Sequence, residues 1–245
     1  MAMRLPIWMR SQTASPFSPP TSATALAPQV KLTPSKRSGT MHLTGSENLA
    51  NRTCWVFDMD GTLTLGIHDF EAIRETLGLP AGSPILESLR QLPADVAAVK
   101  HKQLRDIELD IARQATAQPG AHELLELLIT QGKQIGILTR NGKDIAHATL
   151  VACGLMDFFD PSLVLSRDCH APKPEPDGIL ALLNTWNAPP TNAVMVGDYK
   201  FDLMAGQRAE TATIYIDTAG EFVWSDYADY GVRSLKSVVD WLETS

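Results

Sequence analysis

The sequence predicts an α/β fold: a Rossmann-like parallel sheet with a small helical cap inserted after its first strand. Two observations support this prediction. In the second half of the chain, short apolar runs alternate with helical patterns, which is typical of βαβ units. Before that alternation begins, residues 66–118 contain helical patterns and no convincing strand. A chain of 245 residues is long enough for one α/β domain with such an insert.

Five apolar runs are the predicted strands. Residues 53–57 come first, are rich in β-forming side chains and end directly at Asp58. A short run that is apolar on both faces is typical of a buried parallel strand. The other four runs are residues 134–138, 162–165, 193–196 and 213–216.

Helical patterns lie between and after the later strands. In residues 123–130, three leucines fall on one face of the predicted helix. Residues 144–153 predict a second helix, and Gly154 follows at the position where helices often end in a left-handed conformation. The remaining helices are predicted at residues 177–186, 201–209 and 234–242, the last with Ser234 as N-cap.

The insert is predicted to be a cap of three helices, at residues 69–77, 84–92 and 94–116, the second with Pro84 in its first turn. It begins beyond the carboxyl end of the first strand, where open α/β sheets place their ligands. The predicted domains are therefore a core, residues 51–65 and 119–245, and a cap, residues 66–118. The third helix carries several charged residues three or four positions apart, which predicts surface pairs along the helix. Several such pairs are expected among Lys100, Lys102, Arg105 and Arg113 with Asp106, Glu108 and Asp110. The alternative is that one of these basic residues, or Arg140, binds a substrate carboxylate or a second phosphate.

Residues 1–50 are predicted to be a disordered N-terminal segment. They are rich in proline, serine and threonine and show no sustained helical or strand period. Arginines without any acidic residue before Glu47 are typical of an organellar transit peptide, which predicts a plastid or a mitochondrion as the location. The alternatives are a plain disordered tail or a start at Met41, either of which predicts the cytoplasm.

Charge and composition disfavour several other classes of protein. The net charge is -7, whereas a general nucleic-acid binder is more often basic. No apolar run approaches the ~20 residues that a membrane span needs. The three cysteines match neither a zinc site nor a redox pair, so reduced thiols are predicted.

Asp58 and Asp60 follow the first predicted strand, and Gly61 behind them permits a tight turn. Clustered carboxylates raise each other's pKa, and their repulsion costs stability. A bound divalent cation would offset this negative charge, because such cations take oxygen ligands. A carboxylate can also act as a nucleophile, with a second one transferring protons. Taken alone, the pattern also fits a turn or a fragment of a calcium-binding loop.

A second acidic pair, Asp198 and Asp202, follows the predicted strand at residues 193–196. If a helix begins near Lys200, both carboxylates can face the crevice at the end of the strands. The alternative is that Asp198 caps this helix and Asp202 is a first-turn acid that favours the helix dipole. That alternative weakens because two separate predicted strands end in acidic residues.

Two further segments are candidates for binding an anion. Thr139, Arg140 and Asn141 follow a predicted strand and lead into a helix, where a hydroxyl and backbone N–H groups can form an anion site. The alternative there is a helix cap with a surface arginine. Lys173 lies between two prolines on a stiff backbone, from which it would reach a phosphate or the nucleophile carboxylate. The alternative is an exposed lysine in a rigid loop.

Together, these four segments resemble the motifs of the haloacid dehalogenase (HAD) superfamily. The order and spacing of the motifs agree with those of the superfamily, and the resemblance covers residues 53–243. The helical insert is similar to the C1 cap of phosphoglycolate phosphatase-like members. The similar segments are Asp58-x-Asp60-Gly-Thr-x-Thr64 for motif I, Thr139 for motif II, Lys173 for motif III and Gly197-Asp198-x-x-x-Asp202 for motif IV.

The resemblance implies a Mg²⁺-dependent phosphatase that acts on a small phosphorylated metabolite. Asp58 would attack phosphorus and form an aspartyl-phosphate, and Asp60 would be the general acid and then the general base. An oxygen of Asp58, the backbone carbonyl of Asp60 and Asp198 would bind Mg²⁺. Asp202 would support the metal shell or orient Lys173. The residues expected to bind the phosphoryl group or the rest of the substrate are Thr139, Arg140, Asn141 and Lys173.

Asp60 decides between reaction classes within the resemblance. Dehalogenases of this superfamily lack an acid at that position, so its presence favours phosphoryl transfer. A sugar-phosphate mutase of the β-phosphoglucomutase type keeps the acid and stays an alternative, although its cap is typically larger. A non-catalytic binding protein on a HAD scaffold is a third hypothesis, which the intact motifs disfavour.

Overall fold

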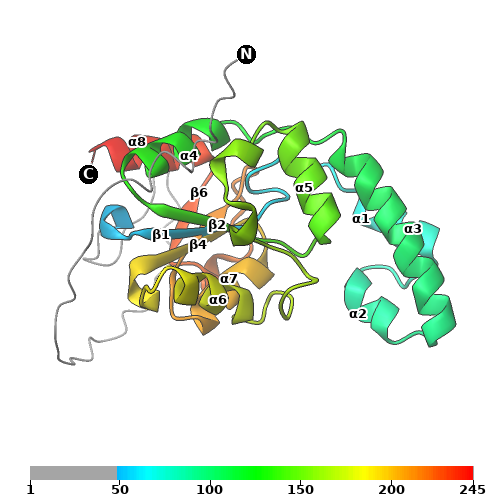
Figure 1. The fold of residues 1–245 in the computed structure, drawn as a ribbon. Helices are drawn as coiled ribbons and strands as arrows, with labels where there is room; N and C mark the ends of the chain where they lie inside the picture. The colour runs from blue at the N-terminus through cyan, green and yellow to red at the C-terminus, as the bar shows by residue number, and fades with distance from the viewer. Residues whose placement is uncertain (1–48, 245) are drawn as a thin grey trace, which may run out of the picture.

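The structure is a computed structural model that describes residues 49–244. Its centre is β1 (Cys54–Phe57), whose four residues are all buried. β1 pairs with a strand on each side, and every pairing in the sheet is parallel, in the order β3-β2-β1-β4-β5-β6 (Figure 1). The other strands are β2 (Gln134–Leu138), β3 (Val164–Leu165), β4 (Ala193–Gly197), β5 (Ala212–Ile216) and β6 (Tyr230–Val232).

All five predicted strands are present, with two differences at the edges of the sheet. β3 has two residues, because a 3-10 turn at Pro161–Leu163 occupies the start of the predicted run. β6 was not predicted; it is a three-residue edge strand that contains Gly231 and pairs with β5. So short a segment has no apolar run to distinguish it from a loop.

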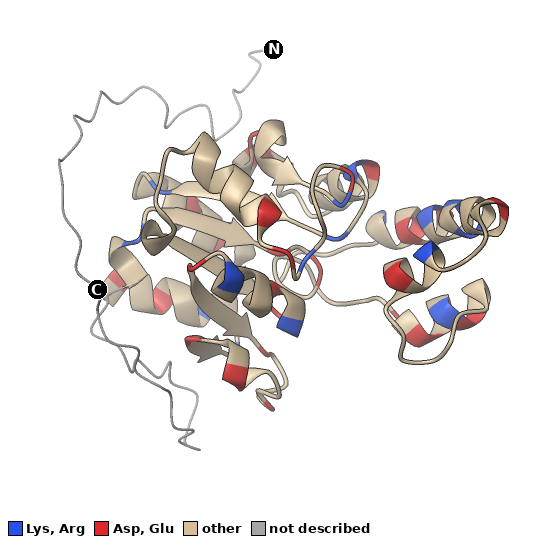
Figure 2. Ribbon diagram, turned by 90° about the horizontal axis from the view of Figure 1, so that it is seen from below, with Lys and Arg blue, Asp and Glu red and all other residues tan. Residues whose placement is uncertain are grey.

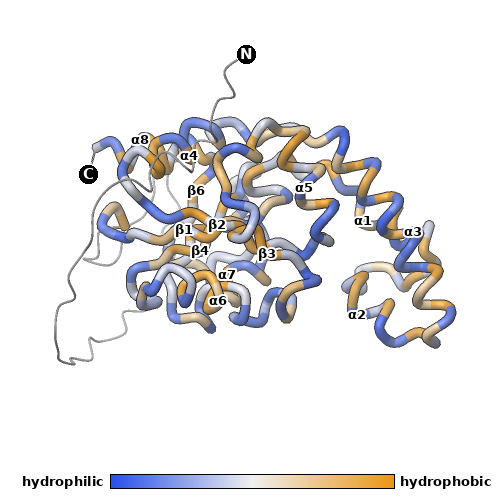
Figure 3. The backbone as a smooth tube through the Cα atoms, in the orientation of Figure 1, coloured by the Kyte–Doolittle hydropathy of each residue, from blue (hydrophilic) through white to orange (hydrophobic). Residues whose placement is uncertain are grey.

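Helices cover both faces of the sheet, as its apolar strands require (Figures 1 and 3). One apolar cluster joins the sheet to α4 (Ala121–Thr130), α5 (Lys143–Ala152) and α8 (Leu235–Thr244). A second cluster joins the other face to α6 (Asp177–Thr185) and α7 (Lys200–Arg208). These five helices agree with the predicted ones to within two residues at each end.

The predicted end signals of two helices are confirmed. Gly154 has a φ of +66° after α5, and the N–H of Leu155 bonds to the carbonyl of Leu150 at 2.9 Å. Ahead of α8, the Ser234 hydroxyl accepts from the N–H of Ser237 at 3.2 Å.

The insert forms a separate group of three helices at one side of the sheet (Figure 1): α1 (Phe70–Leu77), α2 (Ile85–Arg90) and α3 (Ala94–Ala112). These cap helices share their own apolar cluster, formed by Ile73, Leu77, Leu86, Leu89 and Leu104. α3 ends four residues before the predicted 116, because the chain there returns to the core as an extended linker. Pro84 precedes α2 as its N-cap instead of lying in its first turn.

Two linkers connect the cap helices to the sheet, and they run side by side. The N–H of Leu65 bonds to the carbonyl of Thr116 at 2.9 Å, and the N–H of Gln118 bonds to the carbonyl of Leu63 at 2.8 Å. The insert is therefore attached at a single paired point. The limits predicted for the cap, residues 66 and 118, stay a prediction.

Charges of both signs lie along the cap helices (Figure 2). The predicted surface pairs are confirmed for Lys102 with Asp106 and for Arg113 with Asp110, at 2.8 and 2.9 Å. Arg105 and Glu108 instead form ion pairs with residues of the core. Helical spacing shows which charges share a face, whereas the partner depends on what that face packs against.

The predicted disordered segment and transit peptide fall almost wholly outside the described residues. Among residues 49–244, none of the helices is both long enough and apolar enough to span a membrane. The three cysteines are free, as predicted: Cys54 and Cys153 are buried and Cys169 is exposed.

Candidate active site

The carboxyl ends of β1 and β4 meet at the point where the strand order of the sheet reverses. β1 is followed by Asp58 and β4 by Asp198, and the N–H of Asp58 bonds to the carbonyl of Val196 at 2.9 Å. A crevice at such a reversal is the usual ligand site of open α/β sheets. The sheet order therefore brings together two acids that are far apart in the sequence.

Lys173 is buried among these acids, which excludes the alternative of an exposed lysine. Its side chain is 2% exposed, and its ammonium contacts Asp58 Oδ1 and lies 2.6 Å from Asp202 Oδ1. Asp202 lies in the first turn of α7 and also accepts from the N–H of Tyr199 at 3.0 Å. Tyr199 caps α7, so the structure does not support Asp198 as the cap.

Gly61 is required where the chain turns after Asp60. Its φ of +83° is one that residues with a side chain rarely adopt. A Cβ at this position would lie 2.2 Å from Asp198 Oδ2, so the carboxylate occupies the space that a side chain would need. Thr62 donates from its hydroxyl to Asp198 Oδ1 at 3.4 Å. The turn after β1 thus determines where the Asp198 carboxylate lies.

The loop after β2 contributes Thr139 and Asn141 to the same site. Both are buried, and the Thr139 hydroxyl accepts from the N–H of Asn141 at 3.1 Å. The side-chain amide of Asn141 donates to Asp60 Oδ2 at 2.6 Å. Asn141, predicted to bind the substrate, therefore contacts the predicted general acid directly.

Arg140 points away from the carboxylates, towards the cap. Its guanidinium pairs with Glu87 of α2 at 2.6 Å and lies over the ring of Phe201, 4.9 Å from the centroid. In this arrangement the charge of Arg140 is engaged by Glu87. Its contact with substrate stays a prediction.

Burial dominates the electrostatics of the cluster. It raises the pKa of Asp58 against the attraction of Lys173, and repulsion from Asp60 adds to the rise. Burial also raises the pKa of Asp198 well above its usual range and that of Asp202 to about 6. For Lys173, burial lowers the pKa, but the charges of Asp202 and Asp58 outweigh it and the pKa is raised. Lys173 is thus a permanent cation beside carboxylates that resist ionisation.

Asp60 has the properties that a general acid needs. Burial raises the pKa of its carboxyl, while the nearby His68 and the hydrogen bond from Asn141 act in the opposite direction. A carboxyl whose pKa lies nearer to the working pH keeps its proton for transfer to a leaving group.

The cluster also suits a hard divalent cation. Asp58, Asp198 and Asp202 each place a carboxylate oxygen within 4.8 Å of the others. Oxygen ligands of this kind are those that Mg²⁺ prefers, and a cation would offset the repulsion that raises their pKa. Both oxygens of Asp202 are engaged, Oδ1 by Lys173 and Oδ2 by the N–H of Tyr199, whereas Lys173 contacts Asp58 through Oδ1. Asp58 and Asp198 are therefore the better side-chain ligands.

Glu108 and Arg167 also border the site, and the sequence did not predict them as functional residues. Arg167, in the loop after β3, forms two hydrogen bonds to the Glu108 carboxylate and one to the carbonyl of Arg140. Glu108 had been assigned to a surface pair on its helix. Arg167 belongs to no motif, so local spacing contains no signal for it.

Comparison with known proteins agrees with this site. The model of the family named haloacid dehalogenase-like hydrolase matches residues 64–216, which is more than half of the chain. The chain belongs to this family. The match begins after Asp58 and Asp60, so the interpretation of those two residues depends on the geometry described above.

Relatives of this HAD-like hydrolase include proteins named as phosphatases. A haloacid dehalogenase-like hydrolase domain-containing protein of Arabidopsis thaliana is 31% identical over 211 residues, which cover 78% of this chain and 83% of the relative. A protein of Dickeya dadantii named probable phosphatase IndB is 33% identical over 184 residues, covering 65% of this chain and 78% of the relative. The family and such relatives place this HAD-like enzyme among the phosphatase-type hydrolases.

A solved structure shows the same fold. A hydrolase from Pseudomonas syringae superposes on this HAD-like chain with a TM-score of 0.66 and 24% sequence identity, covering 79% of this chain and 98% of the other. The overall fold of this chain is therefore shared with that hydrolase.

Proposed function

We propose that the protein is a Mg²⁺-dependent phosphatase that hydrolyses a small phosphate monoester through an aspartyl-phosphate on Asp58. The observation that supports this most directly is the buried position of Lys173 between Asp58 and Asp202, beside Asp198. An acid, a permanent cation and oxygen ligands for a metal thus converge at one strand end. This arrangement suits an attack on a group that carries negative charge.

In the proposed first step, a carboxylate oxygen of Asp58 attacks phosphorus and the bond from phosphorus to the leaving oxygen breaks. Asp60 donates its proton to that oxygen, which leaves as an alcohol. In the second step, Asp60 takes a proton from water as the water oxygen attacks the same phosphorus. The bond between phosphorus and Asp58 breaks, and inorganic phosphate and both carboxyl groups are regenerated.

The surrounding residues supply charge and position. Thr139 and the backbone amides of its loop would hold the phosphoryl oxygens, and Lys173 would offset their charge. Asp58, Asp198 and the backbone carbonyl of Asp60 would hold Mg²⁺, with Asp202 keeping Lys173 in place. When bound, Mg²⁺ would supply positive charge opposite the developing charge of the transferring group.

The first test is hydrolysis of 4-nitrophenyl phosphate by the purified protein with Mg²⁺ and with EDTA. Activity should require Mg²⁺. The variant Asp58→Asn should lose turnover by at least about 10³-fold, because the nucleophile is gone while the shape of the side chain remains. Its circular dichroism spectrum should match that of the wild type. Full activity in Asp58→Asn, or undiminished activity in EDTA, would reject the proposal.

The sugar-phosphate mutase alternative predicts a different product. With a hexose phosphate as substrate, a mutase would convert one isomer into another with little release of inorganic phosphate. A phosphatase would release phosphate in proportion to the substrate consumed. A panel of phosphorylated metabolites, assayed for free phosphate and for isomers together, separates the two and identifies the preferred substrate.

We propose further that the N-terminal segment directs the protein to a plastid or a mitochondrion. This proposal rests on the composition of residues 1–46, which include arginines and lack acidic residues. Mass spectrometry of the native protein should then find a mature N-terminus near residues 40–50. An N-terminus at Met1 or Ala2 would reject it.

A further inference from the structure

A largely buried ion pair joins the cap to Arg167, in the loop after β3. Glu108, on α3, accepts two hydrogen bonds from the guanidinium of Arg167, at 2.9 Å to Oε1 and 2.8 Å to Oε2. The side chains are 10% and 16% exposed. A paired, two-point contact of this kind determines the orientation of the guanidinium plane as well as its position.

Arg167 also holds the loop after β2, residues 139–141, through two further hydrogen bonds. The nitrogen Nη1 that contacts Glu108 also donates to the carbonyl of Arg140 at 3.1 Å. The backbone N–H of Arg167 donates to the carbonyl of Asn141 at 3.0 Å. One residue therefore binds the cap and two consecutive peptide groups of the loop.

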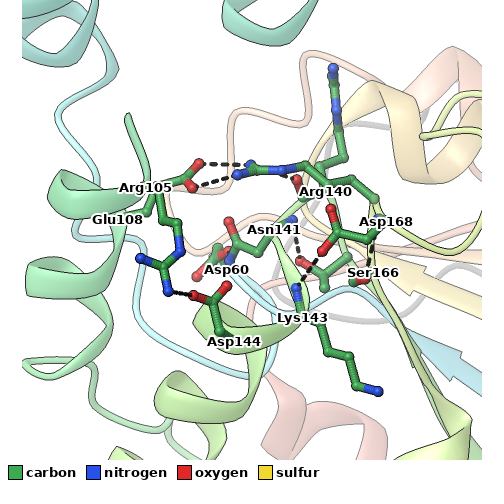
Figure 4. A network of polar contacts seen from close by, with 11 residues as sticks. Asp60, Arg105, Glu108, Arg140, Asn141, Lys143, Asp144, Ser166 and Asp168 are labelled. Carbon is green, nitrogen blue, oxygen red and sulfur yellow. Dashed lines mark hydrogen bonds and ion pairs between the residues drawn. The ribbon is translucent and has the colours of Figure 1, made fainter. Parts of the chain in front are cut away.

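The same loop holds the carboxyl group of Asp60. Asn141 Nδ2 donates to Asp60 Oδ2 at 2.6 Å, and the backbone of Asn141 is the part that Arg167 binds. Hydrogen bonds thus connect a cap residue to the proposed general acid through two intermediates, Arg167 and Asn141. Figure 4 shows Glu108, Asn141 and Asp60 close together in this network.

We propose that Arg167 is a positioning residue for Asp60, and that Glu108 engages it when the cap is docked on the core. This inference rests on the proposed phosphatase function. With Glu108 in place, Arg167 holds the loop so that the Asn141 amide fixes one oxygen of Asp60 and leaves the other to face the leaving group. Catalysis is sensitive to such placement, since a misplacement of about 1 Å can cost 10²-fold in rate.

A second ion pair between cap and core provides a matched control. Arg105, also on α3, pairs with Asp144 of α5 at 2.5 Å, and these side chains are 54% and 44% exposed. It spans the same boundary as Glu108 and Arg167, but its described contact is with α5 and not with the loop at residues 139–141. Loss of this pair tests what an ion pair between cap and core contributes by itself.

The experiment compares two esters that differ in how much they need a general acid. The leaving group of 4-nitrophenyl phosphate is stable as an anion, whereas a simple alkyl phosphate must have its leaving oxygen protonated. In the wild type and in Arg167→Met, Glu108→Gln and Arg105→Met, kcat and KM are measured with both esters. Rescue is tested with Arg167→Lys, which keeps the charge and loses the two-point geometry.

We expect Arg167→Met to lower kcat/KM, which reports the first step alone, by about 10- to 100-fold for the alkyl ester and by less than about 5-fold for 4-nitrophenyl phosphate. Glu108→Gln, which keeps the shape of the side chain, should show the same preference with a smaller loss. Arg167→Lys should recover part of the activity with the alkyl ester. Arg105→Met should change both esters equally, by less than about 2-fold.

An equal loss of kcat/KM with both esters in Arg167→Met and in Glu108→Gln would overturn the assignment and leave a cap-closing role. If Arg167→Met does not fold, Glu108→Gln decides by the same criterion. A wild type that hydrolyses neither ester would overturn the proposed phosphatase function and this assignment with it. A wild type that is active and loses activity in Asp58→Asn establishes the function independently of Arg167.

Discussion

At the scale of single residues, the site concentrates acids beside one buried ammonium. Asp58, Asp198 and Asp202 lie together, and Lys173 contacts two of them. Burial raises the pKa of all three carboxyl groups, so their charge is costly without a further cation. The residues that shape the cluster therefore matter as much as the acids, and Gly61 is the clearest example.

The variant Gly61→Ala should impair Mg²⁺ activation. The new Cβ would lie 2.2 Å from Asp198 Oδ2 and would displace that carboxylate, on a backbone with a φ of +83°. We expect the Mg²⁺ concentration for half-maximal activity to rise by about 10-fold or more, since one displaced ligand costs more than about 1.4 kcal/mol. A Mg²⁺ titration of phosphatase activity measures this.

The matched control is Gly132→Ala. Gly132 has a φ of +72°, but no atom lies within 4 Å of its added Cβ. This variant carries the same kind of backbone strain, about 1 kcal/mol, without contact with the site. If both variants shift the Mg²⁺ titration equally, strain alone accounts for the effect and the position of Asp198 does not.

At the scale of elements, the cap helices have a core of their own. Their apolar cluster is separate from the two that cover the sheet, and the chain enters and leaves them through paired linkers. α3 is the cap element that meets α5 of the core. A cap with its own core can loosen while the sheet stays folded.

The variant Leu89→Ala tests this separation. Leu89, on α2, is fully buried, and its truncation should cost the cap about 2–5 kcal/mol. Amide hydrogen exchange should accelerate in α1, α2 and α3 and stay unchanged in β1 and β4. Val99→Ala, an exposed position on α3, is the control and should change little. Equal acceleration in the sheet would show that cap and core unfold as one unit.

At the scale of the whole molecule, the buried carboxyl groups couple stability to pH. Their pKa is raised in the folded state, to about 6 for Asp202, so the folded protein binds more protons than the unfolded one above pH 4. Their contribution to stability is thus present below the unfolded pKa and is lost as pH rises through the folded pKa. Mg²⁺ should restore it, because the cation binds the ionised form.

In EDTA, the protein should lose this contribution to its stability as pH rises from about 4 to 7, which lowers its melting temperature. Added Mg²⁺ should raise the melting temperature at pH 7–8 and have little effect near pH 4, where protons compete for the same oxygens. Differential scanning fluorimetry across this range, with and without Mg²⁺, measures both effects. In Asp198→Asn, which keeps the shape of a proposed ligand, the Mg²⁺ effect should shrink. A Mg²⁺ effect independent of pH would contradict this account.

The sequence by itself determined the central strands, the helices that cover them and the acids at the ends of β1 and β4. These features are local, because a few consecutive residues are enough to determine a strand end or an amphipathic face. Lys173 was also predicted from its prolines and its motif. The resemblance also implied its contact with Asp202, whereas the depth of its burial follows from the path of a loop that no short pattern describes.

Only the tertiary structure decided how the cap meets the site. Glu108 and Arg167 are 59 positions apart, and Arg140 pairs with Glu87 across a similar separation. Each of these partners lies on an element whose position depends on how the cap helices pack and on how the linkers pair. Charge pairing of this kind depends on distance in space, and the spacing of residues along the chain does not determine that distance.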